Sequence, residues 1–245
     1  MQPEVSLPAE PFCEHCQLGP LLITNSMVIM FVVMFGLLLV AFAVRRRLTA
    51  VPGGLQNFME FLLEAVDGMI EPALGRHAAR LFPLIATIFI FILFANWFSL
   101  VPLVGTIGRI EIHDGHEVLI PFLRPATADL NMTIALALVA FFTIHFSGIA
   151  SHGPIGHLKA LSQNLLLAPV FIAIELFVVV SLSFRLFGNL LAGDVLIGIS
   201  SWILPIAGVG FLLLEVLFGL IQAVIFTMLT LSFTSVAIGS SEEHA

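Results

Sequence analysis

Two long apolar stretches fill the last third of the chain. Residues 165–200 and 202–238 run for about 36 and about 37 residues with few polar interruptions. A helix rises about 1.5 Å per residue, so each stretch would extend over roughly 54–56 Å, nearly twice the ~30 Å hydrocarbon core of a bilayer. Each therefore holds either two short membrane spans or one long, steeply tilted helix. Because no turn signal divides the first stretch cleanly, we predict a single hairpin of two long helices that turns near residues 201–205.

The composition is typical of a chain whose solvent is lipid. Of its 245 residues, 59% are hydrophobic and 10% are charged, whereas soluble domains carry about 25% charged residues. This excludes a soluble globular domain, a disordered chain and a nucleic-acid-binding protein. The formal net charge of −7 also argues against anionic surfaces as partners of the chain as a whole.

Three shorter apolar segments come earlier, at residues 21–44, 81–104 and 130–150, and each is long enough for one span. Arg45, Arg46 and Arg47 follow the first at once, so the positive-inside rule places that end in the cytoplasm and the N-terminus outside.

Residues 55–74 have apolar side chains at three- and four-residue spacing, which predicts an amphipathic helix on the cytoplasmic surface. The predicted fold is an all-α polytopic membrane protein. It has about five membrane helices plus one amphipathic surface helix, and the last two helices are long, strongly tilted and form a hairpin.

Four ionisable residues lie deep inside apolar sequence: Glu175, Arg185, Asp194 and Glu215. An arginine at the bilayer centre costs about 2.5–3.5 kcal/mol on insertion scales, so such residues face a protein interior or a water-filled cavity and often mark an ion path. The alternative is that these charges are structural pairs that hold the helices together.

The spacing of these residues carries further information. Facing residues of an antiparallel hairpin have a constant sum of residue numbers, and the pairs Arg185–Gln222 and Asp194–Glu215 have almost the same sum. One hairpin therefore places both pairs opposite each other. Arg185 and Asn189 are four residues apart and share a face, whereas Arg185 and Asp194 point to opposite sides of a straight helix.

This geometry suggests a mechanism. Two carboxylates that lie close together repel when both are ionised, so one of them should hold a proton unless water screens them. Asp194 and Glu215 could thus relay protons, and the fixed charge of Arg185 would repel cations that pass between two aqueous access points.

Several segments together resemble one known family. SLSFRLFGNLLAGD, residues 181–194, resembles the signature of subunit a of the F-type ATP synthase membrane sector, Fo. FANWFSLVPLVG, ATADLNMTIALAL and LIQAVIFTMLT are similar to three other segments of that family and come in the same order. The resemblance extends over residues 81–238, although VVVSLSFR lacks the proline that often precedes the signature.

The resemblance implies a stator that lies beside a rotating c-subunit ring and provides two offset half-channels. Arg185 would separate these half-channels, with Asn189 and Gln222 as its polar neighbours. Asp194 and Glu215 would occupy the outer half-channel, and Glu175 would lie near the inner one.

The implied partners are the c-ring, peripheral stalk subunit b, other ATP synthase subunits, membrane lipid and a translocated H⁺ or Na⁺, with no nucleic acid. The implied location is the bacterial inner (plasma) membrane, with the C-terminus in the cytoplasm. Since the sequence has no Walker A loop, we expect a subunit that binds no nucleotide, cofactor or metal and is not itself an enzyme.

These predictions divide the chain into five parts. They are an external tail (1–20), a first transmembrane helix with the surface helix (21–80), a transmembrane hairpin (81–160), the long hairpin with the ion path (161–240) and a C-terminal tail (241–245).

Histidines and cysteines outside the long hairpin leave an alternative function open, a self-contained polytopic metal-ion transporter. Cys13, His15 and Cys16 form an incomplete tetrahedral set that could also be a local disulfide or have no role. His113, Asp114 and His116 form a second cluster in a loop that is predicted to be solvated.

A purely structural membrane scaffold is a third hypothesis. Near the third span, Asp129 and Asn131 are expected to cap the helix.

Overall fold

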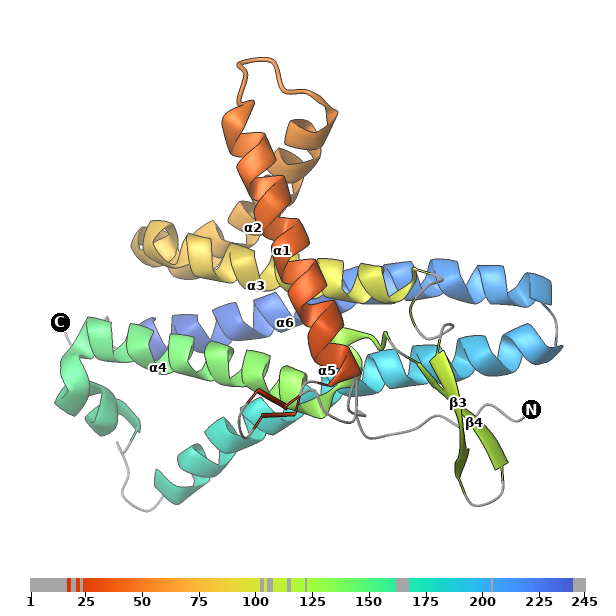
Figure 1. The fold of residues 1–245 in the computed structure, drawn as a ribbon. Helices are drawn as coiled ribbons and strands as arrows, with labels where there is room; N and C mark the ends of the chain where they lie inside the picture. The colour runs from red at the N-terminus through yellow and green to blue at the C-terminus, as the bar shows by residue number, and fades with distance from the viewer. Residues whose placement is uncertain are drawn as a thin grey trace.

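The computed structural model describes residues 17–18, 21–22, 24–101, 104, 108–113, 116–121, 123–161, 168–203 and 205–239. In this part of the chain, helices account for nearly all of the regular structure (Figure 1). The α-helices are α1 (Asn25–Arg46), α2 (Gly54–Leu74), α3 (Ala78–Ser99), α4 (Leu130–Leu161), α5 (Ala168–Ile203) and α6 (Pro205–Gly239). Short 3₁₀ helices occur at η1 (Gly75–His77) and η2 (Ala126–Ala128).

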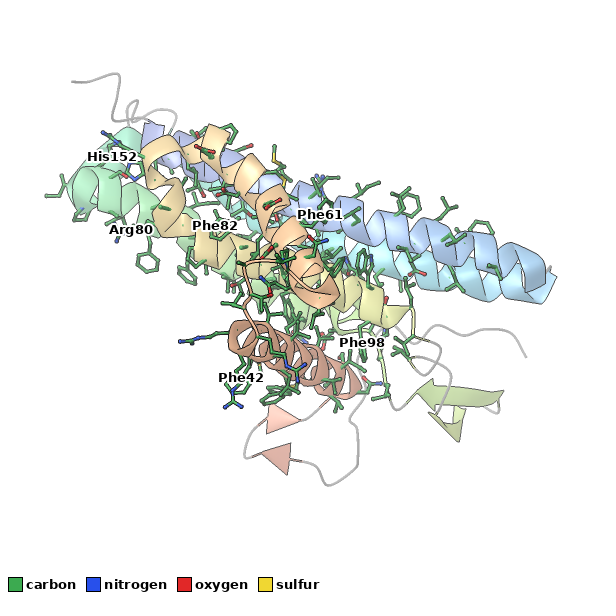
Figure 2. The ribbon with its side chains drawn as sticks, turned by 90° about the horizontal axis from the view of Figure 1, so that it is seen from above. Phe42, Phe61, Arg80, Phe82, Phe98 and His152 are labelled. Atoms are coloured by element: carbon green, nitrogen blue, oxygen red, sulfur yellow. The ribbon has the colours of Figure 1, made fainter. Side chains whose placement is uncertain are left out.

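Helices α3 to α6 run alongside one another, and α1 crosses them at a steep angle (Figure 1). Side chains from α2 to α6 form the main apolar core, and α1 packs on a smaller cluster that includes Ile29, Val33 and Ala95. Large apolar side chains such as Phe42 and Phe61 remain exposed on the outside (Figure 2). The bundle thus has an apolar core and an apolar surface, which is the arrangement that a lipid solvent allows.

Four helical segments in the described part of the chain are long and apolar enough to cross a membrane. They are Asn25–Arg46, Gly54–Ser99, Leu130–Gly156 and Val209–Gly239, and α5 adds a shorter apolar segment at Phe177–Gly193. The predicted all-α membrane architecture is therefore confirmed.

Both helices of the long hairpin form close to the residues predicted for them. α5 and α6 are each one continuous helix of 36 and 35 residues, and they run antiparallel on either side of residue 204 (Figure 1). The prediction of one long hairpin is confirmed, and the alternative of two short spans in each stretch is wrong.

The amphipathic helix predicted at residues 55–74 forms as α2, whose bounds agree with the prediction to within one residue. Leu62, Val66, Ile70 and Leu74 recur every four residues and are buried, while Glu60 and Glu64 lie on other faces. This single buried stripe is the pattern that the sequence predicted.

Some boundaries differ from the prediction for local reasons. α1 begins at Asn25 because the hydroxyl of Thr24 accepts a hydrogen bond from Met27 N at 3.4 Å and caps the helix. α3 ends at Ser99 rather than at residue 104, three residues before Pro102. α4 continues past residue 150 to Leu161, through a kink at Gly153 (φ 72°).

Two small antiparallel ribbons were not predicted. β1 (Gln17–Leu18) pairs with β2 (Leu21–Leu22), and β3 (Gly108–His113) pairs with β4 (His116–Pro121). The second ribbon lies in the connection that the sequence suggested was only a polar loop. Its sequence does carry a hairpin signal, since Asp-Gly joins the two strands.

Candidate functional site

Arg185 lies on the outer face of α5. Exposed residues recur along this face at three- and four-residue intervals, while Leu182, Leu186 and Leu190 are buried on the opposite face. The exposed stripe consists of Phe177, Val180, Ser181, Phe184, Arg185, Gly188, Ala192 and Val195. Arg185 forms no hydrogen bond or ion pair with any other residue that the structure describes. Its charge is therefore presented outward from the middle of an apolar stripe.

The buried face of α6 is unusually polar. Glu215 is 8% exposed and Gln222 is 4% exposed, and the stripe continues through Thr227, Thr230 and Thr234. The hydroxyls of Thr230 and Thr234 donate to carbonyls of their own helix.

Two groups of this stripe remain without a partner. Among the described residues, no hydrogen bond satisfies Gln222 Nε2 or Thr227 Oγ1. Buried polar groups are normally hydrogen-bonded, so these two donors mark the stripe as a place where water or an ion would be stabilised.

α5 and α6 face each other at Gly193 and Glu215. A Cβ atom added to Gly193 would lie 2.5 Å from Glu215 Oε1. This contact confirms the register that the residue-number sums predicted to within one residue. The side chains of Asp194 and Glu175 lie outside the described part, although both residues belong to α5. The predicted Asp194–Glu215 pair thus stays a prediction.

A small cavity of about 100 Å³ lies where α3, α5 and α6 meet. Its polar wall comes from Asn96, Asn189 and Glu215, and its remaining wall is mostly apolar. This volume has room for several water molecules, and three polar side chains are enough to hold them. The fold therefore brings Asn189 and Glu215 together at one cavity, which neither Arg185 nor Gln222 lines.

Asn96 and Trp97 bind α6 beside this cavity, a role that was not predicted for either residue. Asn96 Nδ2 donates to Gly219 O at 3.4 Å, and Trp97 Nε1 donates to Val216 O at 3.1 Å. Thr127 Oγ1 in turn donates to Asn96 Oδ1 at 3.1 Å. The only available signal was the polar Asn-Trp pair inside an apolar segment, which in a membrane helix indicates contact with another helix.

Asp129 has the capping role that was predicted for it. Its Oδ1 accepts from Asn131 N at 2.9 Å at the start of α4. Its Oδ2 accepts from Ser26 Oγ at 2.9 Å, which connects the first turns of α1 and α4. The second contact was not predicted, because it joins residues that are distant in sequence.

The residues of the alternative metal site are only partly described. His113 and His116 are paired at the end of the β3–β4 ribbon, while Cys13, His15, Cys16 and Asp114 lie outside the described residues. Within the described ranges, no group of three His, Cys, Asp or Glu residues is arranged to hold a metal ion.

Comparison with known proteins gives a consistent result. The sequence model of the family described as ATP synthase A chain matches residues 25–235. The protein named ATP synthase subunit a from Mycobacterium ulcerans is 37% identical over 216 residues, which cover 84% of each chain. The one from Gloeobacter violaceus is 35% identical over 232 residues, which cover 93% of this chain and 89% of the relative. A Bradyrhizobium protein named ATP synthase subunit a 2 is 33% identical over 228 residues, which cover 91% of this chain and 92% of the relative.

Proposed function

This chain belongs to the ATP synthase A chain family, and from that premise we propose that it is the ion-conducting stator subunit of a rotary F-type ATP synthase. In this proposal it provides two half-channels and an essential arginine for H⁺ or Na⁺ translocation that is coupled to rotation of the c-ring. The observation that carries the proposal is the outward-facing Arg185, with a polar cavity one turn along the same helix.

The exposed stripe of α5 supports a protein partner at Arg185. A charged guanidinium that faces hydrocarbon is costly, so a surface that presents it should be covered by something other than lipid tails. Gly188 and Ala192 are small, and no described atom beyond the adjoining turns of α5 lies within 4 Å of a Cβ built on Gly188. Small residues allow a second helix to approach closely. A ring of hairpin subunits that carry a carboxylate would meet both requirements.

The cavity beside Glu215 supports an aqueous path that ends near Arg185. Asn189 lines this cavity and lies four residues from Arg185 on the same helix, about 6 Å along the axis. An ion could therefore pass from water at Glu215 to a ring carboxylate at Arg185. We assign Asp194 and Glu215 to the outer half-channel, Gln222 to the neighbourhood of Arg185 and Glu175 to the inner half-channel.

The fixed charge of Arg185 has two functions in this proposal. It blocks direct passage of cations between the half-channels, because a guanidinium stays protonated even when it is desolvated. It also stabilises the ionised form of a ring carboxylate that comes alongside it, and so favours release of the ion that this carboxylate carries.

The location and the assembly follow from the same proposal. The chain is a membrane protein, and we place it in a bacterial inner membrane with its N-terminus outside and its C-terminus in the cytoplasm. Its partners would be the c-ring and peripheral stalk subunit b, and nucleotide binding would be left to other subunits. The alternative metal transporter finds no support in the comparisons.

The test is Arg185→Ala in the assembled complex, with ATP-driven ion pumping measured in inverted membrane vesicles with and without sodium. Pumping should fall to background while the amount of assembled complex stays normal, because Arg185 forms no bond within the described part of its own chain. Ser181→Ala, one turn away on the same stripe, is the matched control and should pump normally. Normal pumping by the Arg185→Ala complex would overturn the proposal.

A second variant separates the ion path from a purely structural scaffold. Asp194→Asn combined with Glu215→Gln keeps the size of both side chains but removes their charge and their proton. The half-channel proposal expects a loss of ion pumping with normal assembly. A loss of assembly with an unchanged pumping rate per complex would favour the scaffold.

A further inference from the structure

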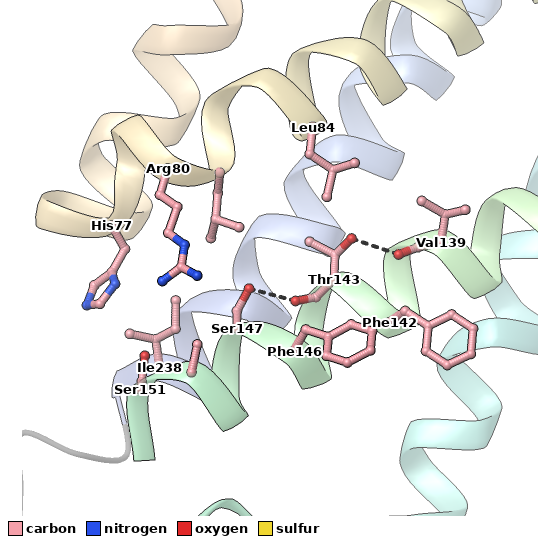
Figure 3. A pocket seen from close by; sticks show the side chains of 12 residues that line it. His77, Arg80, Leu84, Val139, Phe142, Thr143, Phe146, Ser147, Ser151 and Ile238 are labelled. Carbon is pink, nitrogen blue, oxygen red and sulfur yellow. Dashed lines mark hydrogen bonds between the residues drawn. The ribbon is translucent and has the colours of Figure 1, made fainter. Parts of the chain in front are cut away.

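A second cavity, of about 360 Å³, lies at the end of the bundle that is predicted to face the cytoplasm. It is an open groove lined by η1, the start of α3, the middle of α4 and the last turn of α6 (Figure 3). None of the residues assigned to the ion path lines it.

The cavity has a polar end and an apolar end. His77 and Arg80 lie at one end near Ser151, and Leu84, Val139 and Phe142 lie toward the other (Figure 3). The wall between them is less polar than its composition suggests. Thr143 Oγ1 donates to Val139 O at 2.7 Å and Ser147 Oγ donates to Thr143 O at 2.6 Å, so both hydroxyls are already satisfied within α4.

The cavity is long enough for the acyl chain of one lipid, which extends through half of the hydrocarbon core. Residues 139, 143, 147 and 151 line it at four-residue spacing, so it follows α4 for about 18 Å. Half of the ~30 Å hydrocarbon core is about 15 Å. A single acyl chain could therefore lie along α4 with its polar head at the level of Arg80.

Arg80 supplies a charge that the described part of its chain does not neutralise. Its side chain is exposed, and it forms no hydrogen bond or ion pair with the rest of the described chain. The neighbouring His77 has its Nε2 accepting from Arg76 Nε at 3.3 Å. The net charge of the whole chain is negative, but this end of the cavity is basic and would attract an anion.

We propose that this cavity binds one anionic phospholipid. Arg80 binds the headgroup phosphate, and an acyl chain packs along Leu84, Val139, Phe142 and Phe146. Basic pockets between membrane helices on the cytoplasmic side are suited to anionic headgroups, and the apolar end requires a ligand with a hydrocarbon tail. The site is separate from the proposed ion path, so it does not depend on the role of Arg185.

The acidic end of the chain itself is the competing occupant. Residues 240–245, SSEEHA, follow directly after α6 and carry two glutamates that could pair with Arg80. This segment has no large apolar side chain for the other end of the cavity. A lipid satisfies both ends, and the acidic segment satisfies only one.

The experiment uses the intact ATP synthase complex in mixed phosphatidylcholine and phosphatidylglycerol vesicles. Phosphatidylglycerol and phosphatidylcholine probes carry the same photoactivatable acyl chain, and cross-linked residues are mapped by mass spectrometry. In the unmodified complex, the phosphatidylglycerol probe should label residues 81–84 and 139–146 in preference to the phosphatidylcholine probe.

Three variants test the two ends of the site. Arg80→Gln should lower this labelling about fivefold, which is the factor one basic residue contributes to binding of anionic lipid. Arg47→Gln lies at the same predicted membrane surface outside the cavity and should leave the labelling unchanged. Val139→Trp should fill the apolar end and abolish it, and the amount of this chain that co-purifies with the complex shows that each variant has assembled.

Four outcomes would overturn the proposal. One is equal labelling by the two probes, and another is unchanged labelling in the Arg80→Gln complex. A third is labelling that appears only after residues 240–245 are deleted, which would identify the acidic segment as the occupant. The fourth is displacement of the phosphatidylglycerol probe by millimolar inorganic phosphate, which would indicate a site for free phosphate.

Discussion

Gly193 controls the position of a carboxylate. It faces α6, and the space that a side chain would fill is taken by the Glu215 carboxylate. Glu215 is held at the cavity because its neighbour has no Cβ. The glycine therefore determines where this carboxylate lies, in a helix whose intrinsic stability it lowers by about 1 kcal/mol relative to alanine.

Gly193→Ala should reduce ATP-driven pumping by about tenfold or more. The added methyl group would displace Glu215 Oε1, and shifts of about 1 Å in a reacting group cost up to about 100-fold in rate. Pumping in inverted vesicles measures the effect. Gly210→Ala is the control, since no atom lies within 4 Å of its added Cβ. An equal loss of pumping in both variants would show that helix flexibility, not the position of Glu215, limits the rate.

Asp129 combines a helix cap with a contact between helices, and two substitutions separate these roles. Asp129→Ala removes both hydrogen bonds and should lower the free energy of unfolding by about 1–3 kcal/mol. Asp129→Asn keeps a capping oxygen and should lose less. Thermal unfolding in detergent ranks the variants, and equal losses would mean that the bond from Ser26 is the only one that matters.

At the scale of elements, α3 and α6 are joined by side chains that bind main-chain carbonyls. Asn96 and Trp97 reach the carbonyls of Gly219 and Val216, one turn from Glu215. Gly219 permits this approach, because an added Cβ would lie 3.0 Å from Asn96 Cβ. The contact therefore sets how α6 presents Glu215 to the cavity.

Asn96→Ala should destabilise the bundle by about 1–2 kcal/mol. It removes the bond to Gly219 O and leaves Thr127 Oγ1 without its acceptor, and hydrogen bonds between membrane helices average ~0.6 kcal/mol with a maximum near 1.7. Thr87→Ala is the matched control, because Thr87 is exposed on α3 and donates only to Pro83 O of the same helix. Thermal unfolding should show a loss below about 0.5 kcal/mol for this control.

The helices could be predicted from the sequence because apolar runs of this length have few other solutions in lipid. The α5–α6 register could also be predicted, since a hairpin fixes the sum of facing positions and Gly193 meets Glu215 within one residue of it. The contacts of Asn96, and of Ser26 with Asp129, could not be predicted. They join segments far apart in sequence, and nothing in a one-dimensional pattern pairs them.

At the scale of the whole molecule, basic residues follow the first span and precede the second. Arg76 and Arg80 flank the start of α3, and Arg45 and Arg46 lie at the end of α1. By the positive-inside rule, these residues predict a cytoplasmic face. The lipid site and the inner half-channel would both be on that side.

The predicted orientation can be tested with the two native cysteines of the N-terminal segment. After mild reduction, a membrane-impermeant maleimide should label Cys13 and Cys16 in intact cells. In a chain with both replaced by serine, Thr49→Cys lies between α1 and α2 and should react only in inverted vesicles. The reverse pattern would invert the topology and place the lipid site in the outer leaflet.

The contact between Gly193 and Glu215 also limits where residues can be inserted into this chain or deleted from it. One residue inserted in either helix between that contact and residue 204 would rotate one partner by about 100° and move it 1.5 Å along the axis. The cavity would then lose one of its walls. Residues added at the tip itself leave both arms in register, so insertions and deletions should be tolerated at residue 204 and excluded from the arms on either side of it.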